Sequence, residues 1–216
     1  MNNDLKLKQL SKKYFDAEAE NYNNSVDGKF VKSMYEEIIK RVIDENPKDI
    51  LDLGCGNANV ISMLLQKTDA KLYGLDLSEK MIDVCKKRIG KRADFVVGDA
   101  EKLPYKDESM DVIICNASFH HYPNPNIVLE EMWRTLKKGG VLILGDPTAP
   151  KLILQFLNMF IKFSNSGDCK IYSEKGIKNL LVNNNFKIEN WKKISAQKFI
   201  VSGRKFKMPL EKVSVN

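Results

Sequence analysis

Two glycines and one aspartate are spaced as they would be in a nucleoside-binding site. Gly54 and Gly56 form a G-x-G turn between the apolar run 50–53 and a helical pattern at 60–65. Glycine lets the backbone approach a ligand closely, and free N–H groups at a helix start favour a carboxylate or phosphate. Asp76 ends a second apolar stretch at roughly the 20-residue separation at which an acid meets a ribose hydroxyl. The spacing therefore predicts a ligand with a ribose, although a G-x-G turn is also an ordinary strand-to-helix connection.

Further polar side chains follow apolar stretches along the chain. The stretches 71–77, 94–97, 111–116 and 141–144 alternate with segments of helical periodicity such as 79–89. This alternation predicts an α/β fold, with a mainly parallel sheet and helices on both faces. Ligands bind such sheets at the carboxyl ends of the strands, so the polar residues at or near these ends should gather in one place. They are Asp52, Asp76, Asp99, Asn116, His120, His121 and Asp146.

Four short motifs stand in order: L-D-L-G-C-G at 51–56, G-L-D-L-S at 74–78, G-D-A at 98–100 and G-G-V-L at 139–142. Together they resemble the class I S-adenosylmethionine-dependent methyltransferases. The set is most similar to the small-molecule group (methyltransferase type 11) that includes enzymes of ubiquinone and menaquinone biosynthesis. This resemblance implies a Rossmann-like fold with a seven-stranded, mainly parallel sheet and an antiparallel final strand.

The resemblance also implies how S-adenosylmethionine and its product, S-adenosylhomocysteine, are held. Asp99, in the G-D-A turn, would hydrogen-bond the adenine amino group. The segment 14–22 is similar to one that tends to fold over the cofactor in this family. Ala58 departs from the family, which usually has a third glycine there; alanine is small enough to pack a helix against a strand. The implied cofactor-binding residues are Tyr22, Asp52, Gly54, Cys55, Gly56, Asp76, Leu77, Met81, Asp99, Ala100 and Asn116.

The expected organisation is a single methyltransferase domain over 1–216. Within it, we expect a helical lid at 1–30 and a cofactor-binding core at 35–147. Residues 148–205 should supply a substrate wall and the C-terminal strands. A chain of 216 residues can bury one sizeable core, which agrees with a single domain.

The expected reaction is in-line transfer of a methyl group to a small organic acceptor. Such a displacement needs alignment and exclusion of water, and a general base only where the acceptor arrives protonated. His120 and His121, the only two histidines, are the candidate catalytic bases, although a local structural role is the alternative. Leu152, Phe156 and Met159, one helical turn apart, are the predicted apolar wall of the acceptor pocket.

Local patterns predict the remaining elements. Ser78 and Ser173 are expected helix N-caps, and Gly90 is an expected helix end. The expected helices are 4–22, 30–44, 125–138, 152–163 and 173–183; the expected loop is 23–28; the expected C-terminal hairpin pairs 186–193 with 197–205; and 208–216 is an expected tail.

Composition narrows the expectations further. The four cysteines contain no C-x-x-C pair, so we expect neither a zinc site nor a redox dithiol, and no metal. The N-terminus lacks the apolar core of a signal peptide, and the apolar run 152–163 is too short to span a membrane. We therefore expect a cytoplasmic protein, as a monomer or homodimer. The formal charge of +7 would suit an anionic partner such as nucleic acid or a membrane surface. The lysines are scattered as much as clustered, however, which favours a solubilising role.

Three alternatives stay open. A nicotinamide oxidoreductase would need G-x-G-x-x-G, whereas position 59 is Asn. A nucleic-acid methyltransferase would suit the positive charge. Members that methylate amino groups have N-P-P-Y or D-P-P-Y at a strand end, where this chain has N-A-S-F at 116–119, so nucleic acid is the less favoured acceptor. The last alternative is a SAM-binding partner subunit without catalytic activity.

Overall fold

The central sheet determines where ligands can bind. The computed structural model of the protein describes residues 3–206, and within them seven strands form one sheet in the order β3-β2-β1-β4-β5-β7-β6. Six strands point in one direction, and β7 runs antiparallel to its neighbours β5 and β6. The predicted Rossmann-like α/β fold is therefore confirmed. The strands are β1 (Asp49–Leu53), β2 (Lys71–Asp76), β3 (Asp94–Val97), β4 (Met110–Asn116), β5 (Leu136–Pro147), β6 (Phe186–Ser195) and β7 (Lys198–Lys205).

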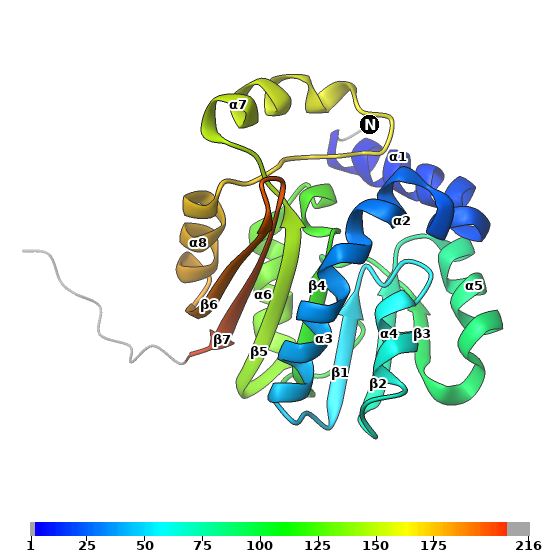
Figure 1. The fold of residues 1–216 in the computed structure, drawn as a ribbon. Helices are drawn as coiled ribbons and strands as arrows, with labels where there is room; N and C mark the ends of the chain where they lie inside the picture. The colour runs from blue at the N-terminus through cyan, green and yellow to red at the C-terminus, as the bar shows by residue number, and fades with distance from the viewer. Residues whose placement is uncertain (1–2, 207–216) are drawn as a thin grey trace, which may run out of the picture.

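Helices cover both faces of the sheet (Figure 1), because successive side chains in a strand point to opposite faces. Ile50 of β1 belongs to an apolar core with α3, α4 and α5, whereas Leu51 belongs to a second core with α6 and α8. Ser78 and Ser173 cap α5 and α8 as expected, and α5 ends at Gly90. The helices are α1 (Asn3–Glu18), α2 (Val26–Val31), α3 (Tyr35–Asp44), α4 (Asn59–Leu64), α5 (Glu79–Ile89), α6 (Pro125–Thr135), α7 (Lys151–Phe160) and α8 (Glu174–Asn183).

One end of the molecule is covered by elements from distant parts of the chain. Figure 1 shows α1, α2 and α7 together above the carboxyl ends of β1, β2 and β4. This is the edge at which parallel sheets bind ligands. Within residues 3–206, every helix is too short or too polar to cross a membrane. The expected tail at 208–216 lies outside the described residues.

The N-terminal segment differs from the prediction of one helix at 4–22 followed by a loop. The first helix stops at Glu18, and a 3₁₀ helix follows at Ala19–Asn24. The predicted loop then contains the start of α2, because the Ser25 hydroxyl accepts a hydrogen bond from the Gly28 N–H (3.0 Å). A side chain at Gly28 would collide with the Tyr22 carbonyl oxygen, 1.9 Å from the Cβ position, so glycine permits this packing rather than marking a loop.

The region after α6 also differs from the prediction. The helix ends at Thr135, three residues earlier than expected, and β5 begins at Leu136. Leu136 pairs with Met110 at the start of β4, and the Lys137 ammonium pairs with two aspartates near the strand starts. These tertiary contacts outweigh the local helical pattern.

Candidate functional site

The glycine turn and Asp76 form one hydrogen-bonded unit. Gly54 and Gly56 have φ values of 72° and 51°, a region that disfavours other residues. The Asp76 carboxylate accepts a hydrogen bond from the Gly56 N–H through Oδ2 and from the Ser78 N–H through Oδ1, both at 2.9 Å. Burial raises the pKa of this carboxyl, although the backbone N–H groups oppose the change. Asp76 is thus fixed at the end of β2 with lone pairs left for ligand hydroxyls.

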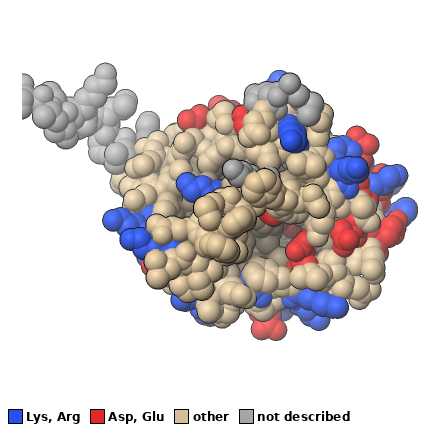
Figure 2. All heavy atoms as spheres, turned by 90° about the horizontal axis from the view of Figure 1, so that it is seen from above, with Lys and Arg blue, Asp and Glu red and all other residues tan. Residues whose placement is uncertain are grey.

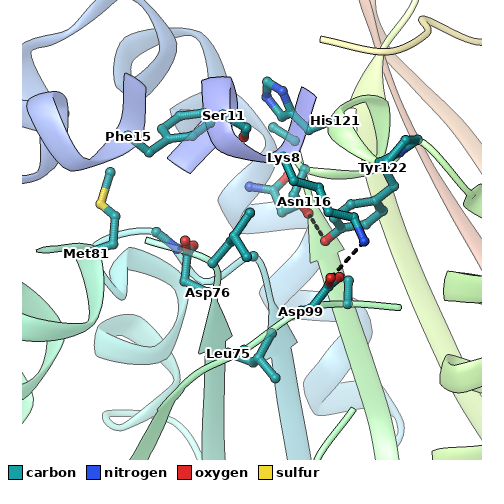
Figure 3. Close-up of a pocket in the computed structure, with 18 of the residues that line it drawn as sticks. Lys8, Ser11, Phe15, Leu75, Asp76, Met81, Asp99, Asn116, His121 and Tyr122 are labelled. Atoms are coloured by element: carbon teal, nitrogen blue, oxygen red, sulfur yellow. Dashed lines mark hydrogen bonds and ion pairs between the residues drawn. The ribbon is translucent and has the colours of Figure 1, made fainter. Parts of the chain in front are cut away.

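The turn after β3 is tied to the N-terminal helix. The Lys8 ammonium lies 2.7 Å from a carboxylate oxygen of Asp99 and 2.7 Å from one of Glu101. Burial acts to lower the pKa of Lys8, but the two carboxylates outweigh it and raise that pKa. Figure 3 shows Lys8 reaching down from α1 to Asp99. The sequence gives no sign of this contact, because 91 positions separate the two residues.

The end of β4 lies beside the glycine turn. The Ser118 hydroxyl donates to the Leu53 carbonyl (3.0 Å) and shares a hydrogen bond with the Tyr122 hydroxyl (3.1 Å). A Cβ at Gly54 would lie 2.5 Å from the Ser118 Cβ, so Gly54 is required by this close approach as well as by its φ value. Neither hydroxyl was among the predicted cofactor-binding residues.

These elements enclose a cavity, here called the cofactor cavity, with a volume of about 90 Å³ (Figure 3). Helix α1 closes it from above through Lys8, Ser11 and Phe15. Ligand pockets usually measure about 300–1,000 Å³, so this cavity is smaller than a typical ligand site. Predicted cofactor-binding residues that line this cavity are Tyr22, Gly54, Gly56, Asp76, Leu77, Met81, Asp99, Ala100 and Asn116.

Asp52 and Cys55 are the two predicted residues that do not line the cofactor cavity. They lie beside a smaller side cavity of about 30 Å³ that also borders Tyr22 and Asn116. Burial, together with repulsion from Asp76, raises the pKa of Asp52 to about 7. The Cys55 thiol lies against Gly74 of β2, so it packs behind the turn rather than towards a ligand.

The two histidines lie on a 3₁₀ turn, Phe119–His121, and face a pair of aspartates. The His120 Nδ1 atom is 2.9 Å from an Asp146 carboxylate oxygen. Burial acts to lower the pKa of His120, but Asp146 outweighs it and raises that pKa. Burial and the neighbouring His120 lower the pKa of His121. Asp168, missed in the sequence, approaches both rings, with its Oδ1 at 3.5 Å from His120 Nε2 and 3.3 Å from His121 Nδ1.

A larger cavity of about 520 Å³, here called the second cavity, adjoins the cofactor cavity. The two cavities share Phe15, Tyr22, Ala117 and His121, so they meet at these side chains. His120 lines the second cavity but not the cofactor cavity.

The prediction that Leu152, Phe156 and Met159 form the apolar wall of the acceptor pocket was wrong. Leu152, Phe156 and Met159 are 81%, 61% and 56% exposed, and none of them lines the second cavity. An adjacent side of α7 faces it, through Leu157 and Phe160. The helix is apolar around most of its circumference, so its sequence does not reveal which side faces inward.

The cofactor cavity suits S-adenosylmethionine. Asn116 lines it, and the Asn116 Oδ1 atom is buried without a hydrogen-bond partner among residues 3–206, which leaves an acceptor for a cationic group. A Cβ at Gly56 would meet only Tyr22, at 3.9 Å, so the floor of the turn is open to a ligand. Asp76 and Asp99 add carboxylates for hydroxyl and amino groups. These acceptors therefore suit an amino acid joined to a nucleoside, whose ammonium, hydroxyl and amino groups are donors.

Solved structures share the fold. A chain from the complex between the Haloferax volcanii Trm112 methyltransferase activator and a methyltransferase superposes with a TM-score of 0.82 at 17% identity, covering 93% of this chain and 100% of that one. A SAM-dependent methyltransferase from Aquifex aeolicus gives a TM-score of 0.63 at 19% identity, covering 78% of this chain and 89% of that one.

Sequence relatives define the family. Residues 51–144 match the methyltransferase domain family. A demethylmenaquinone methyltransferase from Thermotoga maritima is 30% identical over 181 residues, which cover 77% of this chain and 79% of the relative. A 27-O-demethylrifamycin SV methyltransferase from Amycolatopsis mediterranei is 36% identical over 45% of this chain and 38% of the relative. The chain therefore belongs to the S-adenosylmethionine-dependent methyltransferases, and S-adenosylmethionine is its cofactor.

Proposed function

We propose that this enzyme methylates a small, partly apolar organic molecule bound in the second cavity. The observation that carries the proposal is the junction between the cavities, where Phe15, Tyr22, Ala117 and His121 border both. An acceptor in the second cavity would thus lie next to the cofactor. The volume of about 520 Å³ is in the range of small-molecule sites. The relatives named above are named for small organic acceptors, which also supports this class.

Bound S-adenosylmethionine supplies a methyl group on a cationic sulfur, which an acceptor atom takes up by in-line displacement. The protein's part is to orient the acceptor and exclude water. Apolar side chains of α2 and α7, such as Val31 and Phe160, would hold its apolar body. His120 and His121 line the second cavity, so either imidazole is placed to accept a proton from the acceptor.

We infer that residues 3–30 act as the lid over the cofactor. Helix α1 closes a cavity that is too small for a nucleoside, and its Lys8 forms an ion pair with the Asp99 carboxylate. Opening of α1 would admit the cofactor, and closure would bury the reacting groups.

A nucleic-acid acceptor is less favoured by the surface. Figure 2 shows the end of the molecule that carries α1, α2 and α7, with a hollow ringed mainly by uncharged residues. Acidic side chains lie close to the hollow, and lysines and arginines are scattered towards the rim. Binding to nucleic acid usually needs basic residues gathered on one face. We expect a cytoplasmic protein that works as a monomer or homodimer.

The test is turnover of S-adenosylmethionine with a labelled methyl group. A library of phenols, quinols, thiols and amines is compared with bulk RNA and DNA, each at low and high salt. We expect salt-insensitive labelling of one small-molecule class. Labelling that is confined to RNA or DNA and falls steeply with salt would contradict the proposal. Asp76→Ala should abolish most labelling at limiting cofactor, whereas Asp83→Ala, an exposed acid on α5, serves as the matched control.

A further inference from the structure

We propose that His120, His121 and Asp168 bind a divalent transition-metal ion in the wall of the second cavity. One ligand atom from each residue lies within 4.8 Å of the others. The Asp168 Oδ1 atom is 3.5 Å from His120 Nε2 and 3.3 Å from His121 Nδ1. Two ligands bound at about 2.0–2.1 Å in tetrahedral geometry lie about 3.4 Å apart, so these pairs need little adjustment to share an ion.

The partners of the three residues leave the required atoms facing one another. His120 Nδ1 bonds to Asp146, which directs Nε2 towards Asp168, as in the carboxylate–histidine–metal arrangement. The Asp168 Oδ2 atom accepts hydrogen bonds from the hydroxyls of Ser164 (2.6 Å) and Ser166 (2.5 Å). These bonds turn Oδ1 towards the histidines.

One nitrogen in the cluster lacks a hydrogen-bond partner. His121 Nδ1 is buried without a hydrogen bond among the residues that the structure describes, although it faces Asp168 at 3.3 Å. An unsatisfied buried polar atom is costly, and a metal ion would use its lone pair. The side chain is only 10% exposed, and it points into the region where the two cavities meet.

The segment that carries Asp168 is anchored to the turn that carries the histidines. The N–H groups of Cys169 and Lys170 donate to the His120 carbonyl at 2.8 and 3.1 Å. The Cys169 thiol donates to the His121 carbonyl at 3.1 Å. The three ligands are therefore held as one unit, although Asp168 is distant in sequence, and this arrangement was not visible in the spacing of the cysteines and histidines.

An ion at this place has a defined chemical use, which rests on the proposed function. Two imidazoles and one carboxylate suit Zn²⁺, Fe²⁺ or Co²⁺ and leave at least one coordination position open. All three ligands line the second cavity, so an acceptor oxygen or sulfur can take that position. Coordination stabilises the anion, so a hydroxyl or thiol releases its proton to water more readily, and the two histidines then act as metal ligands instead of accepting that proton. The acceptor class then narrows to alcohols, phenols, enols or thiols.

Cobalt binding provides the test. Full-length protein is stripped with a chelator and titrated with Co²⁺, and the visible absorption of the ion reports on coordination. We expect one ion per chain, displacement by Zn²⁺ and a rise in melting temperature with Zn²⁺. Asp168→Asn and His121→Gln should each weaken binding by at least about tenfold. Asp107→Asn removes an exposed carboxylate that pairs with Arg134 and should bind cobalt as the wild type does.

Two results would overturn the metal site: no uptake by the wild type, or equal binding by wild type and Asp168→Asn. In the first case the cluster is an ion pair only. S-adenosylhomocysteine binding, measured on every variant, checks that the fold is intact. Metal binding without methylation of any small molecule would support the metal site and refute the proposed function. If the stripped protein takes up no metal but still methylates a small molecule, the proposed function is supported and the metal site is refuted.

Discussion

Lys8 of α1 and Asp99 after β3 form an ion pair of 2.7 Å across the mouth of the cofactor cavity. The resemblance to small-molecule methyltransferases assigns Asp99 to the adenine amino group. The lysine and the adenine would therefore compete for one carboxylate. Partly exposed ion pairs contribute about 0.2–1 kcal/mol, so the competition is modest and measurable.

Replacing this lysine should ease cofactor entry. We expect Lys8→Ala to bind S-adenosylhomocysteine about two- to fivefold more tightly, mainly through faster association, because Asp99 is released and α1 opens more readily. Stopped-flow fluorescence would give the rates. Lys6→Ala, an exposed lysine on the same helix, is the control and should change little. Weaker binding by Lys8→Ala would mean that the ion pair persists in the bound state and holds the lid closed.

The lid itself is tested by hydrogen exchange. Amide exchange in α1 and in the 3₁₀ helix Ala19–Asn24 should slow by about tenfold or more when S-adenosylhomocysteine is added, because lids belong to the low-stability parts of a protein. Exchange in α8, which lies in the core away from the cavity, should not change. Equal protection of α1 with and without the ligand would indicate a fixed structural helix.

The Asp76 carboxylate accepts a hydrogen bond from the Gly56 N–H and is placed to accept hydrogen bonds from ligand hydroxyls, and two substitutions affect these roles to different extents. Asp76→Ala should weaken binding of S-adenosylhomocysteine by about 1–3 kcal/mol, because ligand hydroxyls would lose a charged acceptor and the Gly56 N–H its partner. Asp76→Asn retains one carbonyl oxygen and should lose less. Calorimetry gives both values. Binding that is unchanged in Asp76→Ala, while Asp83→Ala behaves as wild type, would place the ribose elsewhere.

Asp52 should make stability depend on pH. Burial raises its pKa to about 7 in the folded protein, from an ordinary value of 3.8. Between these values the folded state holds a proton that the unfolded state has released, so stability is lost as pH rises from about 4 to 7. The loss attributable to this group is at most about 4 kcal/mol. The urea-unfolding free energy of the wild type, minus that of Asp52→Asn, should fall over this range and level off above it. A flat difference would show that Asp52 is ionised in the folded protein.

The parts of the site that are local in sequence were predictable. Asp76 ends a strand, and Gly54, Gly56 and Asp99 follow strands. The apolar runs and turn residues of these strands are unambiguous, and the parallel sheet brings the strand ends together. Lys8 and Asp168 were not predictable, because each reaches the site through a tertiary contact made by a separate segment. No local pattern encodes such a contact.

Two other errors have physical causes of their own. The start of α2 was hidden because Gly28 was taken as a loop residue, whereas it relieves a collision with the Tyr22 carbonyl. The inward side of α7 was assigned wrongly because Leu157 and Phe160 are no more apolar than Phe156 and Met159. Composition alone therefore does not set the orientation of that helix.

Ala58 gives a stability test of the glycine turn. Its small size was the reason to accept it in place of the family's third glycine, but the structure shows a different demand. Ala58 has a φ of 64°, in the left-handed region that costs residues other than glycine roughly 1–2 kcal/mol. It is also fully buried, so a glycine would lose the packing of one methyl group. Glycine would also add entropy to the unfolded chain, so these two costs offset part of the relief of strain.

We therefore expect Ala58→Gly to leave the free energy of unfolding about 1–2 kcal/mol higher than Ala93→Gly does, measured by urea denaturation. Ala93→Gly is the matched control, because Ala93 is also buried but has a φ of −149°, where glycine brings no relief of strain. That variant should lower the free energy of unfolding, since glycine adds entropy to the unfolded chain and removes a packed methyl group. If both substitutions destabilise the protein equally, the left-handed conformation at position 58 is not strained, and packing alone governs this turn.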